Sequence, residues 1–222
     1  MTRFQLICYD LDGTLLDSLA DIAGSMNTVL RELGHPEHLV PAYKHFIGDG
    51  ARVLAQRTLP EPERLPDRIH QAHQRFEQVY QDRWNQETRP YDGILQMLSG
   101  VSALGVRQAV LSNKPHRFTV QCVESLLPGE AFDKVYGQRE GIEKKPDPSG
   151  LLQIAREMGV APEAIAYVGD TLVDMQTAVN AGAFPVGVLW GFRDEAELRA
   201  HGAGVLLSHP GEFIEWLKSE GR

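Results

Sequence analysis

The sequence predicts an α/β protein with a doubly wound, parallel-sheet core into which a helical domain is inserted. Three observations predict this fold class. A short apolar run at 4–9 has the length of a buried strand and ends abruptly at an aspartate. Residues 17–87 carry helical or polar patterns without a clear strand. From residue 88 onward, strand-like and helix-like segments alternate, which is typical of a parallel sheet with right-handed crossovers.

The inserted segment follows the first strand directly. Apolar residues recur at helical spacing from Leu19 to Leu33, and Gly34 marks the expected end of that helix. Residues 62–86 (PERLPDRIHQAHQRFEQVYQDRWNQ) predict one long amphipathic helix with proline near its start. We therefore expect residues 17–87 to form a helical cap that hinges over a site on the core, which comprises 1–16 and 88–222.

The rest of the core is built from alternating segments. Short apolar runs predict strands, and amphipathic stretches between them predict helices. With the first strand they make a Rossmann-like sheet, in which ligands bind beyond the carboxyl ends of the strands. The predicted strands are 106–111, 134–137, 164–169 and 185–189, and the predicted helices are 93–104, 116–127, 148–159 and 172–182.

Composition restricts the possible partners. The chain has 222 residues, 42% of them apolar, which is enough for a substantial core, and a net charge of −8 argues against a nucleic-acid surface. There is no apolar run long enough to span a membrane, and the N-terminal run is too short for a signal peptide. Two cysteines within apolar patterns favour a reduced, cytoplasmic protein. We expect a monomer or homodimer that binds a small anionic substrate.

Charged and polar side chains gather where the predicted strands end. Because the carboxyl ends of parallel strands meet at one edge, these side chains are expected to converge there. They are Asp10 and Asp12 after the first strand, Ser112, Asn113 and Lys114 after the second, and Asp170 and Asp174 after 164–169, with Lys144 and Lys145 one helix upstream of that strand.

Asp10 and Asp12 need a partner, because neighbouring carboxylates repel and are costly to bury unpaired. A hard divalent cation offsets that repulsion, and Mg²⁺ typically uses one or two carboxylates together with substrate phosphate. A calcium loop would need glycine at its sixth position and glutamate at its twelfth, whereas Gly13 and Asp21 stand at the fourth and twelfth. A structural turn without chemistry is the remaining alternative.

The four motifs together resemble the haloacid dehalogenase-like hydrolase superfamily. They are DLDGT at 10–14, Ser112 after the second core strand, Lys145 before Pro146, and GDTLVD at 169–174, in the order of that family. Further tracts resemble its phosphoglycolate phosphatase branch, namely TRPYDG at 88–93, SNKP at 112–115, KKPDP at 144–148 and WGFRDEAEL at 190–198. The resemblance spans nearly the whole chain.

The resemblance implies a role for each aspartate. Asp10 and Asp170 bind Mg²⁺ through their side chains, and Asp12 binds it through its backbone carbonyl. Asp10 attacks phosphorus to form an aspartyl-phosphate. The Asp12 side chain protonates the leaving oxygen and later takes a proton from water. Asp174 orients Lys145 or a metal-bound water as an outer partner.

The phosphoryl group is expected to be held by Ser112 and Lys145, with help from the backbone amides near Leu11, Asp12 and Asn113. Ser112 taken alone could be a helix cap, and Lys144 competes with Lys145 for the role of phosphate ligand. The residue directly before Pro146 fits the family motif. Arg52, beside the glycine-rich turn GDGARV at 48–53, is a candidate reader of a substrate carboxylate; a solvated helix arginine is the equally open alternative.

The function that follows is a Mg²⁺-dependent phosphatase acting on a small phosphate monoester, with 2-phosphoglycolate as the leading substrate. A broad-specificity phosphatase, a pyrophosphatase and a phosphosugar mutase of the same superfamily remain alternatives. A dehalogenase would lack the second aspartate, so Asp12 argues against it. A binding protein without catalysis would have lost a motif residue, and every motif residue is present.

Overall fold

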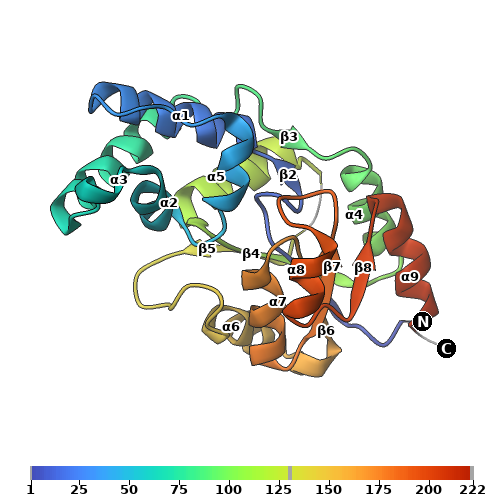
Figure 1. The fold of residues 1–222 in the computed structure, drawn as a ribbon. Helices are drawn as coiled ribbons and strands as arrows, with labels where there is room; N and C mark the ends of the chain where they lie inside the picture. Colours follow the sequence, from blue (N-terminus) through green and yellow to red (C-terminus); the bar gives the residue numbers. More distant parts are fainter. Residues whose placement is uncertain (1, 130–131, 221–222) are drawn as a thin grey trace. The chain divides into compact units, whose positions relative to one another are not determined.

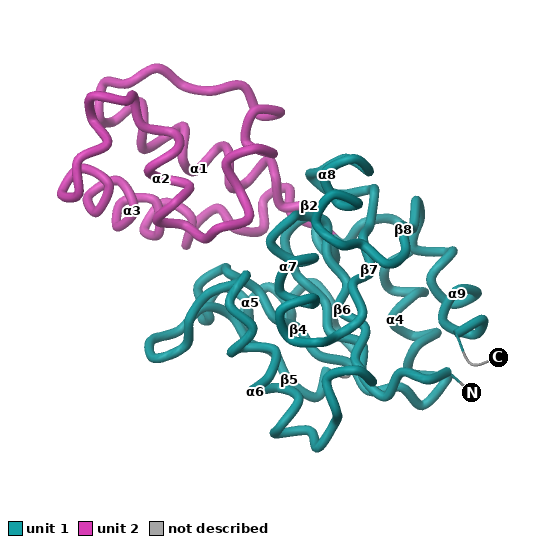
Figure 2. The backbone as a smooth tube through the Cα atoms, turned by 60° about the horizontal axis from the view of Figure 1, so that its bottom comes forward, with its two compact units in different colours: residues 1–16, 90–222 teal, residues 17–89 magenta. Residues whose placement is uncertain are grey.

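The computed structural model describes residues 2–129 and 132–220. Residue 1, residues 130–131 and residues 221–222, which belong to the ranges expected for the core, lie outside the described part. The chain divides into two compact units, one made of residues 1–16 and 90–222 and the other of residues 17–89 (Figure 2).

The first unit is built on a parallel sheet. Within its described residues, six strands lie in the order β5-β4-β1-β6-β7-β8 (Figure 1), and every neighbouring pair is parallel. This confirms the predicted doubly wound α/β fold. The strands are β1 (Leu6–Tyr9), β4 (Arg107–Pro115), β5 (Lys134–Gln138), β6 (Ile165–Gly169), β7 (Phe184–Val188) and β8 (Val205–Leu207).

Helices cover both faces of this sheet (Figure 1). Because side chains alternate along a strand, Leu6 and Cys8 of β1 face one side, where they share an apolar cluster with α6 and α7. On the other side Tyr9 packs against Phe213 of α9, with ring centroids 6.3 Å apart. The helices of the unit are α4 (Ile94–Ala103), α5 (His116–Leu126), α6 (Ser149–Met158), α7 (Leu172–Ala181), α8 (Glu195–Ala200) and α9 (Phe213–Ser219).

The second unit is helical. Its helices α1 (Leu19–Glu32), α2 (Ala51–Thr58) and α3 (Pro66–Gln81) pack on one another through apolar faces. Helix α3 is shorter than the predicted helix at 62–86. Leu65 is extended, as a residue before proline prefers, and Pro66 occupies the first helical turn, where its missing N–H costs nothing. Two 3₁₀ turns, Val40–His45 and Glu61–Glu63, complete the unit.

The two chain crossings between the units form a small sheet of β2 (Leu16–Asp17) and β3 (Arg89–Pro90). The second crossing therefore lies after Arg89, two residues later than the expected end at residue 87. The reason is Asp21 of α1, which is buried. Its carboxylate accepts hydrogen bonds from the backbone N–H groups of Glu87 and Thr88 and from the Thr88 hydroxyl (2.7 Å), so this segment belongs to the helical unit.

No helix in the described ranges combines the length and apolar character that crossing a membrane requires. Cys8 and Cys122 are both free thiols, and both are buried in the core unit. Three elements after residue 190, the helices α8 and α9 and the strand β8, had no counterpart among the segments predicted from the sequence.

Candidate active site

The loop after β1 carries the first two aspartates. The strand ends at Tyr9, and the backbone N–H of Asp10 donates to the carbonyl of Val168 in β6, at 2.9 Å. The chain turns at Gly13, whose φ is 86°. A Cβ atom there would lie 2.3 Å from Oδ2 of Asp170, so only glycine allows this close approach. The turn thereby brings the β1 loop against the β6 loop.

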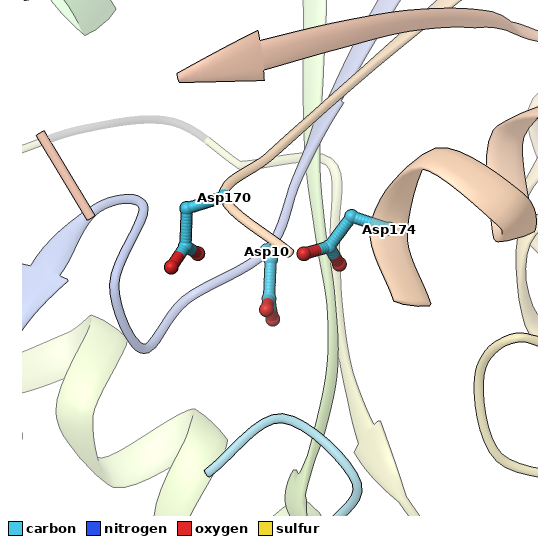
Figure 3. A group of neighbouring side chains, drawn as sticks. All are labelled: Asp10, Asp170 and Asp174. Atoms are coloured by element: carbon cyan, nitrogen blue, oxygen red, sulfur yellow. The ribbon is translucent and has the colours of Figure 1, made fainter. Parts of the chain in front are cut away.

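Three buried carboxylates meet beside this turn. Asp10, Asp170 and Asp174 each offer one carboxylate oxygen, and these oxygens lie within 4.8 Å of one another. Asp10 comes from the end of β1, Asp170 from the loop after β6, and Asp174 from the first turn of α7 (Figure 3). Asp170 and Asp174 are fully buried and Asp10 is 6% exposed. The expected convergence at the carboxyl edge of the sheet is thus observed for these residues.

Lys145 lies among these carboxylates. Its Nζ atom is 3.0 Å from Oδ1 of Asp10 and 2.7 Å from Oδ1 of Asp174. Burial alone would lower the pKa of Lys145, but the two carboxylates raise that pKa above its usual value, so the ammonium stays charged. Lys144, its competitor in the sequence, is exposed.

Asn113 holds the segment that carries Lys145. Its side-chain N–H donates to the Lys145 carbonyl at 3.0 Å, and its side-chain oxygen accepts the Lys145 backbone N–H at 2.8 Å. The Asn113 side chain therefore anchors a neighbouring loop. Any contact of Asn113 with a phosphoryl group would be made by its backbone amide, as the sequence motif implied.

Asp170 and Asp174 are held by hydrogen bonds from neighbouring segments. Oδ2 of Asp174 accepts from the backbone N–H and the hydroxyl of Thr171, which makes a capping box at the start of α7. Asp170 accepts from the Thr14 hydroxyl at 2.8 Å and from the Phe192 N–H at 2.9 Å. These contacts fix the direction of both carboxylates.

The charges in this group do not balance. Three carboxylates face the single ammonium of Lys145, which leaves a formal excess of two negative charges in a buried position. Burial raises the pKa of Asp10 to about 6, against the opposing effect of Lys145. Burial, together with the charges of Asp174 and Asp10, also raises the pKa of Asp170 well above its usual value. An all-oxygen donor set with this excess suits a hard divalent cation such as Mg²⁺.

Asp12 has a different partner. Its two carboxylate oxygens lie 2.9 and 3.0 Å from Nζ of Lys114. Lys114 follows Ser112 and Asn113 in the SNKP tract, and sequence reasoning gave it no role. The only signal was a lysine within that tract at the end of a core strand. Ser112 is buried beside it, and the Ser112 hydroxyl oxygen accepts the Lys114 backbone N–H at 3.3 Å.

The SNKP tract does not follow a strand, as the sequence suggested, but forms the last part of one. Strand β4 continues to Pro115, and its register with β5 shifts between Leu111 and Pro115. The expected end at residue 111 was wrong because this part of the strand is polar, so its apolar periodicity stops early.

Two further contributions to the site come from the WGFRDEAEL tract. The Trp190 indole N–H donates to the Thr14 carbonyl at 2.9 Å, and the Phe192 N–H bonds Asp170. The sequence of this tract indicates a family resemblance but not these contacts. Arg52 lies exposed at the start of α2 in the helical unit, and its assignment as a substrate reader stays a prediction.

The chain is similar to known proteins in sequence and in fold. The sequence profile of the haloacid dehalogenase-like hydrolase family matches residues 7–188. A phosphoglycolate phosphatase of Pseudomonas putida strain KT2440 is 32% identical over 97% of this chain and 78% of its own length. One from Aliivibrio fischeri is 31% identical over 93% of this chain and 90% of its own length.

A crystal structure from Haemophilus somnus, of a predicted phosphoglycolate phosphatase, superposes with a TM-score of 0.88 at 27% identity. It covers 97% of this chain and 99% of its own. These findings confirm the family that the four motifs indicated. The chain belongs to the haloacid dehalogenase-like hydrolases and, among them, to the phosphoglycolate phosphatase branch.

Proposed function

We propose that this chain is a Mg²⁺-dependent phosphoric monoester hydrolase that cleaves 2-phosphoglycolate through an aspartyl-phosphate on Asp10. The observation that carries the proposal is the buried group of Asp10, Asp170, Asp174 and Lys145, with its excess of two negative charges at the carboxyl edge of the sheet. The choice of substrate is supported by the names of the relatives at 31–32% identity.

In the first half of the reaction, a carboxylate oxygen of Asp10 attacks the phosphorus. A bond forms between that oxygen and phosphorus while the bond to the ester oxygen breaks. Asp12 gives its proton to the departing ester oxygen, which leaves as an alcohol. Asp10 suits the role of nucleophile because it stands at the end of β1, held by its backbone bond to Val168.

In the second half, water hydrolyses the aspartyl-phosphate. Asp12, now a carboxylate, takes a proton from the water as the water oxygen bonds to phosphorus. The bond between phosphorus and the Asp10 oxygen breaks, which restores the Asp10 carboxylate and releases inorganic phosphate. One residue thus acts as acid and then as base.

The remaining site residues position the phosphoryl group and the cation. Ser112, the Asn113 amide and Lys145 would hold the phosphoryl oxygens, and Asp174 keeps Lys145 in place through their 2.7 Å contact. The Asp10 and Asp170 side chains and the Asp12 carbonyl would hold Mg²⁺. When bound, Mg²⁺ offsets the charge of the carboxylates and of the transferring phosphoryl group.

The same proposal extends to the cellular setting. We place the enzyme in the cytoplasm as a monomer or homodimer, acting on a small phosphate ester without nucleic-acid or membrane partners. In this proposal the helical unit at 17–89 is a cap that recognises the part of the substrate that leaves.

The proposal is tested by a panel of phosphate compounds assayed with Mg²⁺. The panel contains phosphoglycolate, p-nitrophenyl phosphate, pyrophosphate and a phosphosugar. We expect the highest kcat/KM with phosphoglycolate and no turnover by an Asp10→Asn variant. Similar values for all monoesters would favour a broad phosphatase, a preference for pyrophosphate a pyrophosphatase, and isomerisation without phosphate release a mutase.

A further inference from the structure

Lys114 contacts Asp12, and the proposed reaction assigns no role to this contact. Its ammonium lies 2.9 and 3.0 Å from the two carboxylate oxygens of Asp12, and the two side chains are 4% and 12% exposed. An ion pair this close to full burial loses much solvation, so it is weak evidence for a purely stabilising role. Its partner is the residue proposed to exchange protons with substrate and water.

The backbone of Lys114 is held on several sides. Its N–H donates to the Ser112 hydroxyl oxygen at 3.3 Å, and its carbonyl accepts the Thr119 hydroxyl at 3.1 Å. Gly137 of β5 packs against that carbonyl so closely that a Cβ atom on it would lie 2.6 Å from the oxygen. The lysine is therefore presented from a rigid strand end that also carries the proposed phosphate ligand Ser112.

We propose that Lys114 is the positioning residue for Asp12, holding its carboxylate by both oxygens in the orientation from which Asp12 serves the reaction. This inference rests on the proposed function, in which Asp12 acts as acid and then as base. These two buried lysines contact different aspartates. Lys145 contacts Asp10 and Asp174, which belong to the nucleophile and cation group, whereas Lys114 contacts Asp12.

A carboxylate that transfers protons in both halves of a reaction must be correctly oriented in each half. Proton transfer depends on hydrogen-bond distance to the leaving oxygen and then to the attacking water. A two-oxygen contact to one ammonium restricts rotation about the end of the Asp12 side chain. Loss of Lys114 should therefore damage the step that depends most on Asp12 and spare the step that does not.

p-Nitrophenyl phosphate separates those steps, because p-nitrophenolate leaves without needing a proton. With this substrate, Lys114→Met should still transfer the phosphoryl group to Asp10 and release p-nitrophenol in a burst close to one equivalent of enzyme. Hydrolysis of the aspartyl-phosphate should then be slow, with steady-state turnover lower by about 10²-fold. With phosphoglycolate, whose leaving alkoxide needs the proton, no burst of product is expected.

Lys145→Met is the matched control, since it removes the other buried lysine of the site. It should abolish the burst, because Lys145 contacts the nucleophile itself. Lys114→Met with its turnover and KM unchanged would overturn the inference. If Lys114→Met lost both the burst and the steady-state turnover, as Lys145→Met should, the inference would also be overturned. Lys114 would then be needed for the attack on phosphorus and not for the orientation of Asp12.

A double-variant comparison settles whether Lys114 acts through Asp12. If it does, Asp12→Asn/Lys114→Met should turn over no more slowly than Asp12→Asn alone, whereas independent roles would make the losses multiply. The double variant removes both charges of the pair, so turnover slower than that of Asp12→Asn would overturn the inference even if Lys114→Met does not fold. Failure of the proposed function would appear in the wild-type enzyme, as absence of Mg²⁺-dependent hydrolysis, before any Lys114 variant is compared.

Discussion

Asp170 sits between two glycines, and their lack of side chains decides whether the acidic group can assemble. A Cβ atom on Gly13 or on Gly191 would come within 2.5 Å of the Asp170 side chain. Gly13 also has a φ of 86°, which other residues adopt only with strain. The position of the Asp170 carboxylate therefore depends on the absence of side chains at Gly13 and Gly191 as well as on its hydrogen bonds.

This placement leads to a prediction for Gly13→Ala. The variant should lose most Mg²⁺-dependent activity, because the new methyl group would push Asp170 away. Gly34→Ala is the control: its φ is 75°, but no atom lies within 4 Å of the added Cβ. It should keep its activity and lose only about 1–2 kcal/mol of stability from backbone strain. Urea unfolding and phosphatase assays of both variants check this, and equal effects would refute it.

The raised pKa of Asp10 predicts how stability depends on pH and Mg²⁺. Its pKa is about 6 in the fold against 3.8 for the free side chain. Between these values the metal-free folded state binds more protons than the unfolded state, so its unfolding free energy falls as pH rises. Mg²⁺ relieves the repulsion among the ionised carboxylates.

We therefore expect Mg²⁺ to raise the melting temperature more above pH 6 than below it. Thermal melts of the protein in EDTA and in Mg²⁺, across that pH range, measure the difference. An Asp170→Asn variant should lose most of the Mg²⁺-dependent increase. A Mg²⁺ effect that is the same at every pH would contradict the assignment of Asp10 as a ligand.

At the scale of elements, the sequence predicted what depends on strong apolar patterns. Strands β1, β6 and β7 were found because core strands of a parallel sheet are buried on both faces, whereas the edge strand β5, which is only partly buried, was found from its short run of strand-forming residues. The polar end of β4 was missed because its residues are not apolar, and β8, α8 and α9 were missed because elements of three, six and seven residues are too short to show a period. The start of α3 was predicted too early because the helix begins at Pro66, after the extended residue Leu65, and the apolar period does not show this.

The features of the site also differ in whether the sequence predicted them. Asp10, Asp170 and Asp174 were expected to converge because each stands just beyond a strand end, and strand ends share one edge. The pair of Lys114 and Asp12 was not expected, since it depends on the directions of two side chains, one at the end of β4 and the other in the loop after β1. The hydrogen bonds to Asp170 from the Thr14 hydroxyl and from the Phe192 backbone N–H were not expected either, because they depend on how separate loops fold against Asp170.

Helix α2 contains Arg52, the residue of the helical unit that is predicted to read a substrate carboxylate. The turn before it is held by Arg57, whose guanidinium lies 2.7 Å from Asp49 and donates to the Phe46 carbonyl. Arg52 stands two residues after this ordered turn, which suits a residue that reads a substrate carboxylate by a two-point contact.

Arg52→Ala should therefore lower kcat/KM for phosphoglycolate far more than for p-nitrophenyl phosphate, by an amount corresponding to roughly 2–5 kcal/mol. Arg68→Ala, which removes an exposed arginine of the same unit, should leave both values unchanged. Equal losses on the two substrates, or none, would reject Arg52 as the reader and leave the core chemistry intact.

At the scale of the whole molecule, the helical unit is inserted into the chain directly after the loop that carries Asp10 and Asp12. The chain leaves the core at Leu16, six residues after Asp10, and returns at Pro90. On the core side the two connections are joined by a hydrogen bond from the Tyr91 N–H to the Leu15 carbonyl, at 3.2 Å. Any movement of these connections would thus reach the loop that carries Asp10 and Asp12.

The proposed metal requirement can be tested on the complete enzyme. EDTA should abolish turnover, Mg²⁺ should restore it, and Ca²⁺ should support it poorly, because Ca²⁺ accepts more ligands in looser geometry and would misplace the attacking carboxylate. Steady-state assays after dialysis against chelator measure this. Full activity in metal-free buffer would show that the excess charge of the acidic group serves another purpose.

The central claim is that Asp10 carries the phosphoryl group between substrate and water. Its most direct test is to mix the enzyme with phosphoglycolate and Mg²⁺, quench in acid within a fraction of a turnover, and locate the modification by peptide mass spectrometry. We expect one phosphoryl group on Asp10, removable by hydroxylamine and absent from Asp10→Asn. Rapid turnover with an unmodified Asp10, or a phosphoryl group on another residue, would contradict it.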